Sequence, residues 1–258
     1  MVGNLLREWR QRRHMSQLDL AVEADISTRH LSFLETGRSQ PSREMVLHLA
    51  ELLQIPLRDR NGLLLAAGFA PAFQQRPLED PDLDAARKAV NLILTGHEPY
   101  PATLVDRHWN LVMANRPAMR LMGGIDASLL QPPINVMRIS LHPSGLAPRI
   151  ANFGEWRAHV LARLRHQIQL TADPTLSALL TELLAFELPP GTDSSQDDAH
   201  QFNAVVVPFR LRTEAGVLSF FSTITVFGTP VDITLSELAL EAFFPADAAT
   251  AEALRQMV

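Results

Sequence analysis

Residues 16–37, SQLDLAVEADISTRHLSFLETG, decide the fold of the N-terminal part of this 258-residue chain. Ser16 can cap a first helix, with Asp19 in the place of a capping-box acid. The apolar stripe of that helix would be Leu18, Leu20, Ala21 and Ala24. Ser27 can cap a second helix after a short turn, and Gly37 can end it, because glycine readily adopts a positive φ at a helix end. Two short helices joined by a tight turn predict a helix-turn-helix.

The second of these helices has a polar face that points away from Leu31 and Leu34. That face carries Thr28, Arg29 and Ser32, with Phe33 beside them. A helix of this width fits the major groove of DNA, where arginine can bond guanine and hydroxyls can bond either kind of base edge. Phe33 could touch a thymine methyl group. The alternative is a solvated polar face, with Phe33 packed on a later helix.

Further motifs surround the two helices. They are Gln17, Ile26-Ser27, Leu34-Glu35-Thr36-Gly37-Arg38 and Pro41-Ser42. Over residues 3–70 this pattern resembles the Cro and lambda-repressor type of helix-turn-helix, the xenobiotic-response-element class. The resemblance implies a DNA-binding surface in which Gln17 and Thr36 lie at phosphates and Thr28, Arg29, Ser32 and Phe33 face bases. Arg38 is also expected to be part of this surface. It also implies that Glu35 is structural, and that double-stranded DNA is a partner.

Charge is divided unevenly along the chain. The net charge is −5, but residues 1–70 hold nine Arg against eight Asp and Glu, whereas the remainder holds 14 basic and 20 acidic residues. A surface that approaches phosphate must not be acidic, so DNA binding is expected in the N-terminal part. The chain has no Cys, which excludes disulfides and Cys-zinc sites, and its apolar runs are too short to span a bilayer. We expect a cytoplasmic protein without membrane insertion.

The predicted fold class is α+β in two domains. Residues 1–70 predict an all-α five-helix bundle, the three prolines of 71–81 predict a linker, and helix 82–95 leads into a second domain over 82–258. That domain is predicted to contain strands at 103–106 and 109–115, helices at 116–122, 152–170 and from 174, an antiparallel hairpin of 205–211 with 217–227, and a last helix at 247–257. Residues 134–141 fit either a short helix or an extended segment. Residues 189–201 predict a mobile surface loop, and the capping box Thr234-Leu-Ser-Glu237 predicts a helix through Phe243.

Particular phrases of the second domain carry a family resemblance. VDRHWNLVMANRPAMRLMGG (105–124) resembles the opening of a PAS sensor module. RNGLLLAAGFAP (60–71), HEPYPATLVDRHWN (97–110), SLHPSGL (140–146), FGTPVDITLSEL (227–238) and FFPAD (243–247) resemble the MmyB-like transcription regulators. The resemblance implies a ligand-responsive, sequence-specific regulator whose PAS-like domain accepts a long apolar ligand, with a fatty acid as the expected ligand.

Candidate ligand-binding residues fall into two groups. The tail is expected near Trp109, Leu111, Met113, Phe153, Trp156, Phe209 and Phe220, although such large apolar residues usually form a solid core. An ionised head group cannot be buried unpaired. Its predicted partners are Arg138, His142, Arg149 and Asn152, which cluster just before the helix that carries Trp156. The alternative is that these four are ordinary surface residues, with Asn152 only a helix cap.

Catalytic and metal-binding patterns are missing from the sequence. The nine His lack metal-ligand spacing, and no P-loop, G-x-G-x-x-G or G-x-S-x-G motif occurs, so we predict no enzyme, no metal site and no cofactor apart from the lipid effector. One such bundle reads only a few base pairs, which favours a homodimer. The candidate dimer surfaces are the strand face of Phe221 and Phe227 and the helix 82–95. The alternative function is a DNA-binding regulator whose C-terminal domain only dimerises or binds another protein.

Overall fold

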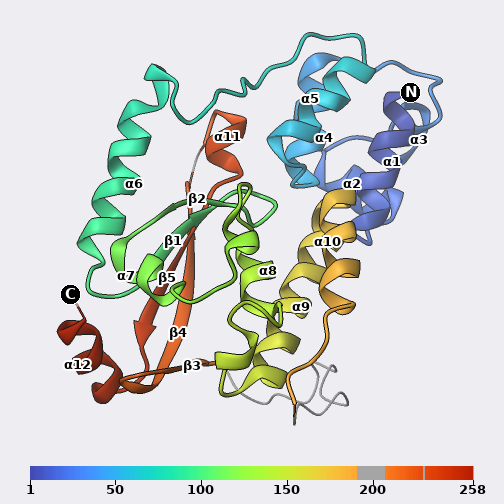
Figure 1. The fold of residues 1–258 in the computed structure, drawn as a ribbon. Coiled ribbons are helices and arrows are strands. Elements are labelled where there is room, and N and C mark those ends of the chain that lie inside the picture. Colours follow the sequence, from blue (N-terminus) through green and yellow to red (C-terminus); the bar gives the residue numbers. More distant parts are fainter. Residues whose placement is uncertain (191–206, 229, 258) are drawn as a thin grey trace. The chain divides into compact units, whose positions relative to one another are not determined.

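The computed structural model describes residues 1–190, 207–228 and 230–257 (Figure 1). Close residue pairs divide the chain into two compact units. The first comprises Met1–Pro77, Gln169–Ala172 and Thr229–Ser236, and the second comprises Leu78–Ile168, Asp173–Gly228 and Glu237–Val258. The first segment of the first unit thus ends inside the predicted linker 71–81.

The N-terminal part of the first unit contains the five predicted helices. They are α1 (Val2–Arg12), α2 (Gln17–Glu23), α3 (Thr28–Glu35), α4 (Arg43–Leu52) and α5 (Leu57–Ala66). The predicted helix-turn-helix is α2 and α3. Ser16 and Asp19 form the expected capping box at the start of α2, and the hydroxyls of Ser27 and Ser42 accept hydrogen bonds at the starts of α3 and α4.

Leucines from all five helices form the core of this bundle, among them Leu6, Leu20, Leu31, Leu34, Leu49 and Leu64. Gly3 permits α1 to approach the end of α3 closely, because a Cβ at position 3 would lie 2.3 Å from the carbonyl oxygen of Leu34. The expectation that Leu18 belongs to the buried stripe is wrong. Its side chain is 60% exposed, since α2 turns Leu20 and Ala21 inward instead.

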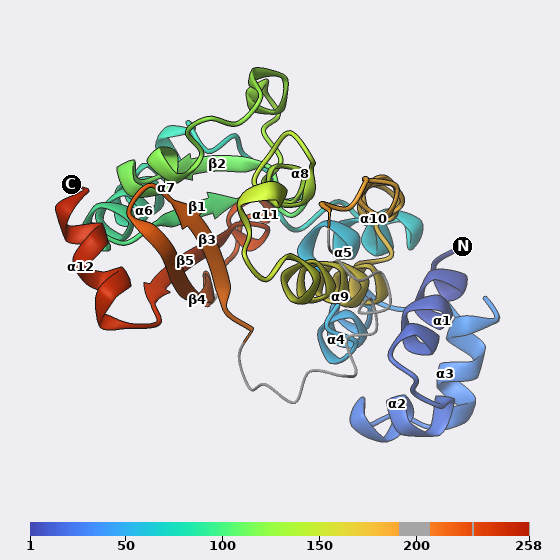
Figure 2. The ribbon, with the colours of Figure 1, turned by 60° about the horizontal axis from the view of Figure 1, so that its bottom comes forward.

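The second unit is built on one antiparallel sheet, flanked by helices. Its main elements are α6 (Asp84–Gly96), β1 (Ala102–Val105), β2 (Leu111–Ala114), α7 (Arg116–Leu121), α8 (Val136–Leu141), α9 (Phe153–Thr171), α10 (Pro174–Leu184), β3 (Phe209–Thr213), β4 (Gly216–Val226), β5 (Ala239–Pro245) and α12 (Ala248–Gln256). The strand order is β2-β1-β5-β4-β3. The helix α6 covers one face of the sheet, and α8 and α9 lie over the other (Figures 1 and 2). The predicted α+β class with an antiparallel sheet is confirmed.

Strand register decides which side chains share the face beneath α8 and α9. Thr103 lies opposite Glu241 across β1 and β5, and Ser222 lies opposite Phe243 across β4 and β5. Because side chains alternate along a strand, Thr103, Ser222, Glu241 and Phe243 all point to this face together with Phe220. Polar groups are therefore brought into an otherwise apolar layer.

The predicted helix from Thr234 to Phe243 is wrong. Only Ile233–Ser236 is helical (α11), and Ala239–Pro245 is the central strand β5, which is paired on one side with β1 and on the other with β4. Thr234 is held differently from a helix cap. Its N–H donates to Asp232 Oδ1 at 2.8 Å, and its hydroxyl donates to the carbonyl oxygen of Arg76. Long-range pairing on two sides outweighs the local capping pattern.

Other expectations differ in detail. The second strand begins at Leu111 rather than at Trp109, because Trp109 adopts a φ of 67° in the turn before β2. Residues 136–141, within the segment that fitted either structure, are helical in α8. The apolar face of β4 is buried as far as Phe220, whereas Ile224 and Val226 are 43% and 61% exposed. The predicted loop 189–201, beyond Pro190, and the start of the predicted strand at 205 lie outside the described residues.

Candidate functional site

The outward face of α3 carries the side chains predicted to meet DNA bases. Arg29 is exposed, and Thr28, Ser32 and Phe33 are half-buried. Beyond the end of the helix, Thr36 and Arg38 are exposed, and the Thr36 hydroxyl donates to the carbonyl oxygen of Ser32 at 2.7 Å. The face is therefore polar and cationic, as a surface that approaches phosphate must be. Contacts of these residues with DNA remain predictions.

Gln17, predicted to lie at a phosphate, is part of a buried polar cluster behind this face. Glu35 receives Arg10 Nε on Oε1 at 2.6 Å and Arg10 Nη2 on Oε2 at 2.9 Å. Its Oε2 also accepts from Gln17 Nε2 at 2.7 Å, and Arg10 Nη1 donates to the carbonyl oxygen of Met15 at 2.8 Å. The hydrogen bond to Glu35 raises the pKa of Arg10. The cluster joins α1 and the start of α2 to the end of α3.

The burial of Arg10 is a feature that the sequence analysis did not identify. Its spacing was the available signal. Arg10 lies four residues after Leu6, so both project from the same face of a helix, and it is only 7% exposed. A charged residue at an apolar position of this kind indicates a buried partner, here Glu35.

A cavity of about 100 Å³ lies in the second unit, between the sheet and the helices α7, α8 and α9. Its lining comprises Pro101, Thr103, Trp109, Ala118, Leu121, Met122, Val136, Met137, Ile139, Ser140, Leu146, Trp156, Val160, Arg163, Phe209, Phe220, Glu241 and Phe243. Most of these side chains are apolar. Ser140 is already engaged, because its Oγ accepts from Trp156 Nε1 at 2.8 Å.

Four of the seven residues predicted around a ligand tail line this cavity, namely Trp109, Trp156, Phe209 and Phe220. Phe153 is buried in the surrounding core. Leu111 and Met113 lie on the edge strand β2, where they are half-buried and outside the lining. Their role as ligand contacts remains a prediction.

The four residues predicted at a head group have other partners and are absent from the cavity lining within the described residues. Arg138 forms a two-bond ion pair with Glu182, at 2.6 and 2.8 Å. Arg149 Nη1 donates to the carbonyl oxygens of Leu121 and Gly123. His142 Nδ1 accepts from the N–H of Ser144 at 3.0 Å. Asn152 Nδ2 donates to Glu155 and to the carbonyl oxygen of Pro208.

The charged residues of the cavity lining are Arg163 on α9 and Glu241 on β5. Arg163 Nη1 and Nη2 both donate to Glu241 Oε1, at 3.0 and 3.1 Å, and the Ser222 hydroxyl donates to the same oxygen at 2.9 Å. Arg163 Cζ lies 4.3 Å from the centroid of a Trp109 ring. Within the described part of the chain, the buried Arg163 Nε has no hydrogen-bond partner. Burial lowers the pKa of Arg163, and the charge of Glu241 opposes this shift.

Sequence reasoning missed this ion pair, although each member left a trace. Arg163 follows Trp156 by seven residues and Val160 by three, which places it on the apolar side of its helix. Ser222 interrupts an apolar alternation and points to Glu241. The position of Glu241 itself could not be recognised while 234–243 was read as a helix, because its neighbours on the sheet come from other strands.

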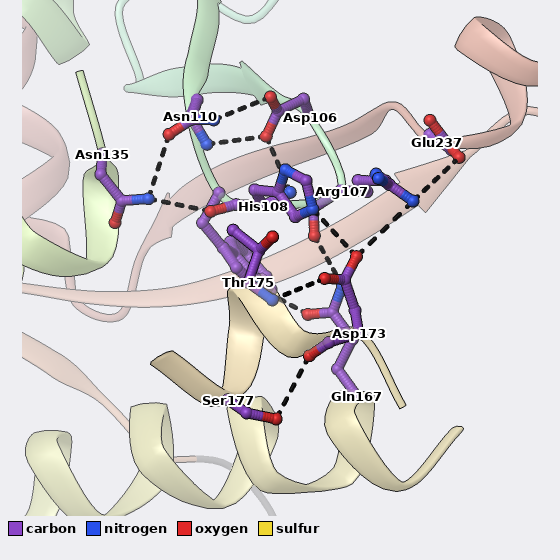
Figure 3. A network of polar contacts seen from close by, with 11 residues as sticks. Asp106, Arg107, His108, Asn110, Asn135, Gln167, Asp173, Thr175, Ser177 and Glu237 are labelled. Atoms are coloured by element: carbon purple, nitrogen blue, oxygen red, sulfur yellow. Dashed lines mark hydrogen bonds and ion pairs between the residues drawn. The ribbon is translucent and has the colours of Figure 1, made fainter. Parts of the chain in front are cut away.

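A polar network holds the turn before β2 (Figure 3). Trp109 belongs to this turn and lines the cavity. Asp106 Oδ1 accepts from the N–H groups of His108 and Asn110, at 2.8 and 2.9 Å. Trp109 Nε1 donates to Gln167 Oε1 at 2.7 Å, and Gln167 Nε2 donates to the carbonyl oxygen of Arg107. These bonds fix the positive φ of Trp109, an uncommon conformation for a residue with a side chain, and so fix its ring beside Arg163.

The described ranges contain no group of three His, Asp or Glu side chains placed to hold a metal ion. None of the helices traced there combines the length and apolarity needed to cross a bilayer.

Comparisons with known proteins identify both parts of the chain. Residues 6–59 match a helix-turn-helix family, and residues 86–257 match the MmyB-like transcription regulator ligand binding domain. None of the curated proteins compared with the chain matches it.

Among solved structures, a variant of RsLOV is 17% identical over 65% of this chain and 75% of that chain, with a TM-score of 0.30. An RNA-binding light-oxygen-voltage receptor is 15% identical over 95% of this chain and 63% of that chain, with a TM-score of 0.29. These TM-scores are too low to support an argument. The match to the MmyB-like ligand binding domain covers well over half of the chain. The chain therefore belongs to the MmyB-like transcription regulators, which are DNA-binding proteins with a ligand-binding domain.

Proposed function

We propose that this protein controls transcription by reading an operator with α3 and by binding a long-chain lipid in the cavity of its second unit, with a fatty acid as the expected ligand. The observation that carries the proposal is an apolar cavity lined by a donor, Arg163 Nε, that is buried and has no partner among the described residues, in a chain that also presents a cationic helix-turn-helix. Apolar walls favour the tail, and the donor favours a head group that accepts a hydrogen bond.

The tail gains affinity from burial. Each methylene moved from water into an apolar site contributes about 0.8 kcal/mol. The cavity, at about 100 Å³, is smaller than the apolar cavity of about 150 Å³ that holds benzene in a well-studied case. A long chain therefore requires side chains of the wall to move. Met122 and Met137 are suited to this, because methionine is unbranched and adopts many conformations.

The head group is assigned to Arg163. Its two Nη atoms both bond Glu241 Oε1, and in a planar guanidinium the Nε–H points away from that side. A buried donor without an acceptor costs about 1–3 kcal/mol, so a ligand oxygen at Nε would offset this cost. Arg138, by contrast, is engaged with Glu182 by both Nε and Nη2. Arg163 is therefore favoured over the residues that the sequence suggested.

Homodimerisation is the second element of the proposal. Apolar side chains are exposed on β4 and on α6, where a monomer gains nothing from them. They are Phe221 (37%) on one face of the strand, Ile224 (43%) and Val226 (61%) on its other face, and Leu92 (74%) and Ile93 (50%) on the helix. Burying one of these surfaces in a symmetric dimer would pair two DNA-binding helices for a longer operator.

Operator binding with and without lipid tests the function. A duplex is first selected from a random pool with the full-length protein, and its affinity is then measured by fluorescence anisotropy in the presence of dodecanoic acid or of dodecylamine, a control whose ammonium head group donates hydrogen bonds but accepts none. We expect selection of a defined sequence and a change in affinity with dodecanoic acid of at least about 5-fold, the lower end of usual allosteric coupling. Unchanged affinity, together with purified protein that carries no lipid and shows no thermal shift with fatty acids, would leave the dimerisation-only alternative.

Sedimentation of the full chain tests the dimer. Phe221→Asp places a charge on the exposed part of β4, and Val217→Asp is a matched control, because Val217 is a 53% exposed apolar residue near the hairpin of the same strand. We expect the wild type and Val217→Asp to sediment as dimers and Phe221→Asp to shift toward monomer. A monomeric wild type at high concentration would contradict this element of the proposal.

A further inference from the structure

Phe33 lies between two guanidinium groups at the outward face of α3. Arg29 Cζ is 5.3 Å from the centroid of its ring, and Arg38 Cζ is 5.8 Å from it. Both distances fall within the range of about 6 Å over which a cation is attracted to an aromatic face. Arg29 precedes Phe33 by one helical turn, which places the two side chains side by side. Arg38 lies beyond the helix end.

The backbone brings Arg38 back to the ring. The carbonyl oxygen of Phe33 accepts hydrogen bonds from the N–H of Arg38 at 2.9 Å and from that of Ser39 at 3.1 Å. Gly37 makes this turn possible, because it adopts a φ of 73°. One residue therefore holds Arg38 twice, through its carbonyl group and through its ring.

Within the described residues neither Arg29 nor Arg38 forms an ion pair or a side-chain hydrogen bond. Arginine side chains are long and lose considerable rotamer freedom when they are fixed. The ring of Phe33 is consequently the group that limits their orientations before DNA binds. Phe33 is itself half-buried, so its ring is anchored on the bundle.

We propose that Phe33 is a positioning residue for base reading: its ring pre-orients the Arg29 guanidinium toward a base edge, and Phe33 does not itself read a thymine methyl group. The inference rests on the proposed reading of DNA by α3. It adds that sequence discrimination by Arg29 depends on an aromatic residue at position 33. We expect discrimination by Arg29 to fall when the ring is replaced by an aliphatic side chain of similar size, and to be kept when it is replaced by another aromatic side chain.

The test measures affinities of the full-length protein for the selected operator and for duplexes with single base-pair changes. The variants are Phe33→Leu, Phe33→Trp, Arg29→Ala and the double variant with Phe33→Leu and Arg29→Ala. We expect Phe33→Leu to lower discrimination about 2- to 5-fold, the worth of an exposed cation–aromatic contact, at the same base pair at which Arg29→Ala acts. Phe33→Trp should retain it, and in the absence of Arg29 the Phe33→Leu change should have no further effect there.

A chemical change in the DNA separates the two roles of Phe33. Replacing each operator thymine by uracil removes the methyl group and nothing else, and we expect wild-type affinity to stay within twofold. The inference is overturned if uracil weakens the wild type as much as Phe33→Leu does, or if Phe33→Leu weakens all duplexes equally. Thermal unfolding of each variant shows whether a loss of DNA affinity comes from misfolding. If Phe33→Leu is misfolded, the comparison of Phe33→Trp with the wild type tests the inference instead. A wild type that selects no duplex would contradict the proposed function itself.

Discussion

Each unit of this protein contains an ion pair between an arginine and a buried glutamate, Glu35 in the first and Glu241 in the second. The two pairs differ in how many nitrogens of the arginine have acceptors. Arg10 donates to Glu35 from Nε and Nη2, and its Nη1 donates to a backbone carbonyl. Arg163 donates to a single oxygen of Glu241 from both Nη atoms and leaves the buried Nε without a partner in the described structure. The pKa is raised for Arg10, chiefly by its hydrogen bond to Glu35, and lowered for Arg163 by burial.

The difference is the one expected between a structural ion pair and the proposed head-group site. A buried arginine whose nitrogens all have acceptors links helices and offers nothing to a ligand, whereas one with an unpartnered buried nitrogen retains free energy that a ligand can recover. The second pair lines the cavity of the second unit. The N–H groups of an arginine that have acceptors therefore indicate its role more clearly than the exposed fraction of its side chain does.

The largest effect is expected from Arg10→Met. Removal of one partner of a buried pair leaves an uncompensated charge, so we expect the first unit to lose about 3–5 kcal/mol of unfolding free energy. Urea unfolding followed by circular dichroism measures it. The double variant with Arg10→Met and Glu35→Leu should regain most of the loss, because no charge is then left behind. A single variant as stable as the wild type would show that the pair does not hold the bundle.

Filling the cavity with Ala118→Leu should affect ligand binding next most strongly. Ala118 lines the cavity and is 4% exposed, and the three added carbons displace ligand methylenes worth about 0.8 kcal/mol each. We expect dodecanoic acid affinity, measured by calorimetry, to fall more than tenfold. Val112→Trp is the control, since Val112 is 38% exposed on β2 and lies outside the lining, and it should change affinity less than twofold. Equal losses in both variants would argue against this cavity as the site.

Gln17→Ala should have a smaller effect, spread over all DNA sequences. It removes one hydrogen bond to Glu35, worth about 1 kcal/mol of stability, while Arg10 still pairs with Glu35. Affinity for selected and unselected duplexes should fall by the same factor, because a phosphate contact carries no sequence information. A loss confined to the selected operator, measured by anisotropy, would show that Gln17 acts on base reading instead.

The smallest effect concerns pH. Burial lowers the pKa of His159, with the charge of Arg163 acting in the same direction and that of Glu155 opposing. In the unfolded chain His159 therefore binds a proton below about pH 6.5, whereas in the folded chain it binds that proton only at a lower pH. This contribution to stability is fully present above that pH and is lost as the pH falls toward the folded pKa. Urea unfolding at pH 7.5 and 5.5 should show a smaller decline for His159→Gln than for the wild type; identical declines would contradict the assignment.

Local chemistry in the sequence predicted the helices and the hairpin, and the missed features depend on distant partners. Ser16, Ser27 and Ser42 could be recognised as caps because a cap acts within three residues. The strand β5 could not be predicted, since it follows a helix-start pattern and its partners β1 and β4 come from other parts of the sequence. The head group was sought among Arg138 and its chain neighbours because they are close in sequence. Arg163 and Glu241, 78 residues apart, meet only in the fold.

Lipid binding by the Arg163→Lys variant tests whether the unpartnered Nε–H of Arg163 receives the ligand head group. Lysine keeps the positive charge toward Glu241 but lacks the Nε–H, and Arg138→Lys makes the same change in an ion pair outside the cavity lining. With dodecanoic acid as the probe in calorimetry, we expect Arg163→Lys to lose about 10- to 100-fold in affinity, as befits a hydrogen bond to a charged group. Arg138→Lys should stay within twofold of the wild type. The opposite ranking, or an Arg163→Lys protein that binds as tightly as the wild type, would contradict the claim that the unpartnered donor of Arg163 receives the head group.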